Sequence, residues 1–175
     1  MERPSVRRLR EEIQQTKPFQ DRSHAAGIAL LRTADEGRRT FESLVAPHGV
    51  SIEQYNVLRI LRGAGDGGLC RHEIRDRLLS RMPDVTRLVD RLEEGGLAER
   101  VRDTVDRRVV RTTITDAGRA LLGQLDAPVA AEHARQFGHL SEEEAARLVA
   151  LLDAVRRRPG AAGEQAAPGG AGCDG

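Results

Sequence analysis

The chain has 175 residues, of which 39% are hydrophobic and 31% charged, a composition typical of one ordinary folded domain with appended helices. Its 28 basic and 27 acidic residues give a formal net charge of +1, which excludes a strongly basic coat. An aromatic content of 2% argues against a base-stacking surface for single-stranded nucleic acid. No run of about 18 apolar residues is present, and no apolar segment follows the N-terminus, so we expect a cytoplasmic protein without a membrane partner.

Arginine dominates the basic residues, because Lys17 is the only lysine. The arginine guanidinium binds phosphates and base edges bidentately, so the excess is compatible with nucleic-acid recognition. A high-GC genome would produce the same excess, so both interpretations stay open at this point.

The first 50 residues are predicted to be helical. Residues 1–20 form an arm with a short amphipathic helix that Pro18 ends. A longer helix is predicted from about Asp21 to Ala46, where the segment Pro47 to Gly49 stops it.

Three further helices are predicted before residue 97. Ser51 and Gln54 have the spacing of a capping box, and the glycines within 63–68 end the helix that it opens. A short helix follows at 71–80. Pro83 suits the first turn of the third helix, whose apolar positions recur at i, i+3, i+4 and i+7 and therefore predict a buried face: Val85, Leu88, Val89 and Leu92.

The spacing of apolar residues then changes from that of a helix to that of a strand. Residues 97–102 and the β-branched run 109–115 predict two strands, with a polar hairpin tip at 103–108 between them. Thr115 or Asp116 then caps a helix in which we expect a kink at Pro128. A second capping box at Ser141 opens the last helix.

A helix–turn–helix followed directly by a hairpin is the order of a winged helix-turn-helix. The predicted fold is therefore mainly α with a small β-hairpin. The winged lobe spans 51–115, helical segments at 21–50 and 116–158 flank it, and a Gly- and Ala-rich tail at 159–175 is expected to be disordered.

The third helix of the lobe has the character of a DNA-reading helix. Arg87 and Arg91 are four residues apart and project from one side, outside the buried face. Such a helix fits the major groove, where arginine reads guanine O6 and N7, and arginines of the hairpin tip could reach the adjacent minor groove. The alternative is a solvated helix face on which Asp84 and Asp90 balance the arginines.

Three segments of this sequence, in this order and spacing, resemble the MarR family of bacterial transcriptional regulators. They are Pro83–Leu97, Asp106–Arg108 and Ile114–Gly118, and the resemblance covers about residues 21–157. It implies a homodimer in which the helical segments 21–50 and 116–158 interlock as a dimerisation layer. Each winged lobe would read one half of a pseudo-palindromic double-stranded operator.

The resemblance also implies roles for individual residues. Thr86, Arg87 and Arg91 would face DNA, and Asp106 would orient Arg108 at the wing tip. The family often has serine at the position of Arg81, which here could replace the phosphate contact by a charge-assisted one. The full predicted DNA-binding set is Arg81, Pro83, Asp84, Thr86, Arg87, Asp90, Arg91, Asp106, Arg107 and Arg108.

Family members often bind a small, frequently aromatic, anion between the dimerisation layer and the lobe. By position, Arg39, His48 and Tyr55 would border such a crevice, with ordinary interhelical packing as the alternative. The histidines and cysteines lack the spacing of metal ligands, so we predict no metal and no cofactor, and Cys70 is expected to pack at the start of the helix–turn–helix. No nucleophile–base arrangement or phosphate loop is visible, so we expect no enzyme.

The sequence therefore predicts a homodimeric, sequence-specific regulator that binds double-stranded DNA, acting as a ligand-responsive repressor. The alternative is a ligand- or protein-binding dimer whose winged lobe does not bind DNA tightly. Arg87 together with Arg108 favours the first, because a module without DNA has no need of both.

Overall fold

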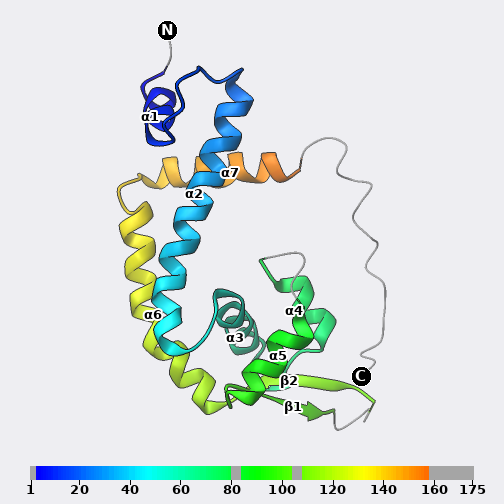
Figure 1. Ribbon diagram of the computed structural model, residues 1–175. Helices are drawn as coiled ribbons and strands as arrows, with labels where there is room; N and C mark the ends of the chain where they lie inside the picture. Colours follow the sequence, from blue (N-terminus) through cyan, green and yellow to red (C-terminus); the bar gives the residue numbers. More distant parts are fainter. Residues whose placement is uncertain (1–2, 80–83, 104–107, 158–175) are drawn as a thin grey trace. The chain divides into compact units, whose positions relative to one another are not determined.

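The computed structural model describes residues 3–79, 84–103 and 108–157 (Figure 1). The chain divides into two compact units, Met1–Ser43 and Leu44–Gly175. Among the described residues, none of the helices is both long and apolar enough to span a bilayer.

The first unit contains helix α1 (Pro4–Glu12) and most of helix α2 (Arg22–Val45). The prediction that Pro18 ends the arm helix is wrong, because α1 ends six residues earlier. Gln14 adopts a left-handed φ of 53°, and the Gln15 N–H turns back to the Arg10 carbonyl at 2.9 Å. The start of α2 is as expected: Asp21 accepts a hydrogen bond from the His24 N–H at 2.8 Å.

The second unit begins with the 3-10 turn η1 (Ala46–His48), helix α3 (Ile52–Ala64) and the 3-10 turn η2 (Gly65–Gly67). The predicted capping box is confirmed: the Gln54 N–H donates to Ser51 Oγ at 3.2 Å, and the Ser51 N–H donates to Gln54 Oε1 at 2.9 Å.

Helices α4 (Arg71–Arg77) and α5 (Val85–Glu94) complete the helix–turn–helix. Helix α5 begins at Val85, and Pro83, which was predicted in its first turn, lies outside the described residues. Asp84 is the N-cap, and its carboxylate accepts a hydrogen bond from the Arg87 N–H at 3.1 Å. The cap therefore comes from an aspartate that the sequence analysis had placed in the DNA-contacting set.

The strands β1 (Ala98–Arg102) and β2 (Val110–Ile114) form an antiparallel hairpin, called the wing below, with Ala98 opposite Ile114. Leu69, from the link between η2 and α4, pairs with Thr112 through two backbone hydrogen bonds of 2.8 and 3.0 Å. This short bridge along the free edge of β2 was not predicted. Gly68 makes it possible, because its φ is +59° and a Cβ there would lie 2.7 Å from the Thr112 carbonyl oxygen.

Apolar side chains of α3, α4, α5 and α6 (Asp116–Phe137) share one core. Of the predicted stripe on α5, Val85, Val89 and Leu92 are buried and Leu88 is half-buried, so the predicted buried face is confirmed. The largest fully buried side chains of this core are Leu58, Leu61, Ile74, Leu92, Leu122 and Leu125.

Helices α6 and α7 (Glu142–Arg156) have the predicted caps. The Ser141 capping box opens α7, with the Glu144 N–H donating to Ser141 Oγ at 3.2 Å. Thr115 is the N-cap of α6, and the helix continues through Pro128.

Thr115 and Gly118 also fasten α6 to the base of the wing. Thr115 Oγ1 donates to the Gly96 carbonyl at 2.7 Å and accepts from the Gly118 N–H at 3.1 Å, and the Thr115 N–H donates to the Leu97 carbonyl. A Cβ at Gly118 would overlap the Leu97 carbonyl oxygen and lie 2.8 Å from Ile114 Cγ1. Only glycine fits this contact.

We therefore predict that Gly118→Ala lowers the free energy of unfolding by about 2 kcal/mol, because the added methyl group overpacks the wing base. Gly123→Ala on the same helix is the matched control, since a Cβ there meets nothing within 4 Å. It should be neutral or stabilise by up to about 1 kcal/mol. Urea unfolding at one protein concentration measures both, and equal effects of the two variants would contradict the packing role of Gly118.

Candidate nucleic-acid interface

The exposed face of α5 carries the predicted base-reading residues. Thr86, Arg87 and Arg91 are all exposed, opposite the side that Val89 and Leu92 bury. Neither guanidinium forms an ion pair with any residue that the structure describes. These two arginines therefore present their charge to the solvent.

The acidic residues of α5 are engaged elsewhere. Asp84 caps the helix, and Asp90 pairs with Nη2 of Arg100 on β1. Glu93 accepts two further hydrogen bonds from Arg100, at 2.6 Å from Nη1 and 3.2 Å from the backbone N–H. We call this set of contacts the Arg100 clamp. It argues against the alternative in which Asp84 and Asp90 neutralise Arg87 and Arg91.

The hydrogen bond that Arg100 donates to Asp90, helped by the charges of Glu93 and Asp90, raises the pKa of Arg100. Sequence reasoning missed Arg100, although Asp90 and Glu93 have the i, i+3 spacing of a two-pronged acidic site. The spacing alone does not identify the partner of the two carboxylates, because Arg100 reaches them only when the hairpin folds back beside α5.

A second arginine fastens the other strand of the wing. Arg111 on β2 donates to Asp103 at 2.9 Å and lies 3.5 Å from Glu73 on α4. Glu73 in turn accepts a hydrogen bond from the Cys70 N–H at 2.8 Å, at the start of α4. Cys70 is buried there, as expected for its place at the start of the helix–turn–helix.

The remaining predicted DNA contacts are only partly described. Arg108 is exposed at the end of the wing next to β2. Arg81, Pro83, Asp106 and Arg107 lie outside the described residues, so their roles stay predictions.

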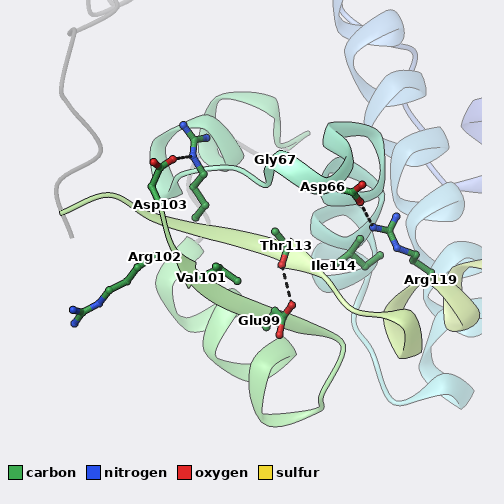
Figure 2. Close-up of a pocket in the computed structure, with 10 residues that line it drawn as sticks. Asp66, Gly67, Glu99, Val101, Arg102, Asp103, Thr113, Ile114 and Arg119 are labelled. Atoms are coloured by element: carbon green, nitrogen blue, oxygen red, sulfur yellow. Dashed lines mark hydrogen bonds and ion pairs between the residues drawn. The ribbon is translucent and has the colours of Figure 1, made fainter. Parts of the chain in front are cut away.

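A hollow of about 440 Å³ lies on one face of the wing, and Figure 2 draws the residues that line it. Its charged groups are largely paired with one another: Arg119 with Asp66 at 3.2 Å, and Arg111 with Asp103. Arg102 lies at its rim and extends away from it (Figure 2). Because these charges pair with one another, we interpret the residues that line the hollow as a support for the wing.

Two ion pairs hold the lobe on α6. Arg62 on α3 makes a bidentate pair with Asp126, at 2.8 and 2.9 Å, and Arg119 pairs with Asp66. The hydrogen bond from Arg62 lowers the pKa of Asp126 and raises that of Arg62.

The predicted effector residues are distributed over both units. Arg39 lies on α2 in the first unit and pairs with Asp35 one turn away at 3.0 Å. His48 is half-buried in η1, and Tyr55 is buried in α3, with the Arg59 guanidinium 6.0 Å from its ring centroid. Their grouping into one site stays a prediction. No cluster of three potential metal ligands occurs among the described residues.

Comparison with known proteins agrees with this geometry. The model of the MarR family matches residues 48–109. A MarR transcription factor from Planctomyces limnophilus, solved as a crystal structure, is 39% identical, with a TM-score of 0.59, and the match covers 77% of this chain and 98% of that one. This chain belongs to the MarR family of transcriptional regulators. The winged helix-turn-helix fold predicted from the sequence is thereby confirmed.

The names of curated relatives agree with this family assignment. The transcriptional regulator MhqR of Bacillus subtilis is 34% identical over 62% of this chain and 73% of its own length. TtmR of Methylorubrum extorquens is 37% identical over 57% of this chain, and the match spans 50% of TtmR. The crystal structure of CouR from Rhodococcus jostii, bound to p-coumaroyl-CoA, is 27% identical with a TM-score of 0.64, over 78% of this chain and 95% of that one.

We predict that Asp126→Asn destabilises the protein at neutral pH by less than about 1 kcal/mol, since the pair is half exposed and screened by solvent. Because the folded-state pKa of Asp126 is lowered, its contribution is present above the unfolded-state value and is lost as the pH falls through the folded-state value. Wild type and variant should therefore converge in stability in acid.

Arg62→Gln provides the control background, in which the pH-dependent effect of Asp126→Asn should be much smaller, because only the charge of Arg59 then still lowers the pKa of Asp126. Thermal unfolding from neutral to acidic pH measures all four proteins. A difference between wild type and Asp126→Asn that is constant across this range would contradict the assignment.

Proposed function

We propose that this MarR-family chain is a homodimeric, sequence-specific regulator that binds double-stranded DNA and acts as a ligand-responsive repressor without catalytic activity. The observation that carries the proposal is the exposed face of α5. Arg87 and Arg91 lie there without an acidic partner among the described residues, while Asp84 and Asp90 are engaged in a cap and a clamp. Since this partner is chromosomal DNA, we propose a cytoplasmic location.

The chemistry of this face fits the major groove of DNA. A single helix enters the groove, and an arginine donates bidentately to guanine O6 and N7. The wing beside α5 carries Arg108, which is suited to a backbone or minor-groove contact. Because the net charge is only +1, specific placement of arginines rather than bulk charge carries the affinity.

In this function Asp84 and Asp90 have supporting roles, and the direct contacts come from a threonine and five arginines of the predicted set. Thr86, Arg87 and Arg91 contact DNA from α5, and Arg107 and Arg108 contact it from the wing, where Asp106 orients Arg108. Arg81 contacts a phosphate ahead of α5.

A second copy of this chain would cover the bare face of α7. This helix buries none of its residues in one protomer, and Leu148, Leu151 and Val155 fall on one side of it with exposed fractions of 36%, 58% and 59%. Residues 21–50 and 116–158 would form the dimerisation layer. Two reading helices in such a dimer must lie roughly 34–36 Å apart to enter successive major grooves.

The proposed effector is a small organic anion that changes this spacing. The structure of CouR contains p-coumaroyl-CoA, which supports a small-molecule effector for a protein of this fold. Arg39, His48 and Tyr55 are the residues we propose for its site.

We predict that Arg87→Ala weakens binding to an operator selected from a random duplex library by about 1–3 kcal/mol and relaxes the preference at one guanine. Mobility shifts at several salt concentrations measure this. Arg32→Ala, an exposed arginine of α2, is the charge-matched control. Failure to enrich any duplex, or binding unchanged by both Arg87→Ala and Arg108→Ala, would favour a ligand- or protein-binding dimer instead.

For the dimer we predict that Leu151→Lys dissociates the protein into monomers, because burying an unpaired ammonium group is costly. Sedimentation velocity measures the change. Ala146→Lys lies on the opposite side of the same helix and should leave the dimer intact. A wild-type monomer, or a Leu151→Lys dimer of unchanged affinity, would contradict the assignment of this face.

A further inference from the structure

We propose that Arg100 is a positioning residue: the Arg100 clamp holds the wing at a fixed place beside α5, so that the reading helix and the wing engage DNA as one body. The inference rests on the proposed DNA-binding function. It also assigns Asp90 to the support of the wing rather than to base reading.

The contacts of the clamp join two elements at three points. One end of the guanidinium pairs with Asp90, the other donates to Glu93 at 2.6 Å, and the Arg100 backbone N–H donates to Glu93 at 3.2 Å. Asp90 and Glu93 are three residues apart on one flank of α5, so a planar guanidinium can reach both. The side chain of Arg100 is only 32% exposed, which strengthens the pairing relative to a fully solvated one.

The wing needs such an anchor because an isolated two-stranded hairpin is marginally stable. Its other fastenings lie at the base, where Thr115 binds Gly96, and along β2, where Thr112 pairs with Leu69 and Arg111 with Glu73. The strand nearer to α5 is β1, and the clamp joins its middle directly to that helix. Loss of the clamp would therefore leave β1 held only by its pairing with β2 and by the base of the wing, with no direct contact from its middle to α5.

Arg102 provides an internal comparison. It lies two residues further along β1, on the same side of the strand as Arg100, and is exposed. Its guanidinium forms no ion pair with any residue that the structure describes. Arg100→Gln and Arg102→Gln thus remove the same charge from the same side of the wing, and only the first removes the clamp.

A double-variant cycle on operator binding tests the coupling. Arg108→Ala alone should weaken binding about tenfold, as expected for a charged phosphate contact. In the Arg100→Gln background it should weaken binding less than about twofold, because a displaced wing no longer delivers Arg108. In the Arg102→Gln background it should keep its full effect, and Asp90→Asn combined with Glu93→Gln should reproduce Arg100→Gln.

Amide hydrogen exchange without DNA tests the positioning itself. Exchange across β1 should accelerate about tenfold in Arg100→Gln and stay unchanged in Arg102→Gln, with the exchange of α3 and α6 showing that both variants are folded. If Arg100→Gln fails to fold, Arg100→Lys takes its place, because lysine keeps the charge but cannot bridge both carboxylates. Exchange across β1 should then accelerate as well, by a smaller factor.

Two outcomes would overturn the proposal. The first is unchanged β1 exchange in Arg100→Gln. The second combines two results on operator binding. Arg108→Ala would still weaken binding tenfold in the Arg100→Gln background, and Asp90→Asn would change the base preference, which would make Asp90 a base reader. A wild-type protein that selects no DNA would instead refute the proposed function, while the exchange experiment would still decide whether Arg100 positions the wing.

Discussion

Burial of one side of α5 is the constraint on which the interface depends. Val85, Val89 and Leu92 pack into the shared core, and this packing determines the rotation of the helix about its axis. Arg87 and Arg91 then have to face outward. A helix that is apolar on one side and carries exposed arginines on the other can be both a core element and a reader of DNA, and neither role needs a large net charge.

The wing is attached to this core by contacts of three kinds. Thr115 and Gly118 join its base to α6 through a cap and a close backbone approach, and Leu69 adds a short third edge to β2. The clamp from Arg100 joins β1 to α5. Thr115 and Gly118, which belong to the family-like motif, therefore act in architecture, as do Arg100 and Arg111 of the wing. Arg87, Arg91 and Arg108 are the arginines that we propose for recognition.

Local signals in the sequence predicted most of the elements. Caps such as Ser51, Thr115 and Ser141 act within one helical turn, so their effect is visible in a few neighbouring letters. The end of α1 was misjudged because Gln14 takes up a left-handed conformation that a residue of this type rarely adopts. The Arg100 clamp was missed because it joins residues seven and ten positions apart on different elements, a pairing that only the folded hairpin creates. The roles of Arg81, Asp106 and Arg107 stay predictions.

Methylation interference on a selected operator reports directly on the arginines of α5, because a methyl group on guanine N7 blocks the acceptor that arginine uses in the major groove. If α5 of each protomer reads the major groove, we expect two clusters of interfering guanines, one in each half-site, with centres about one helical turn apart, roughly 10–10.5 base pairs. Tight binding that no N7 methylation disturbs would contradict it, since α5 would then not be reading the major groove through arginine.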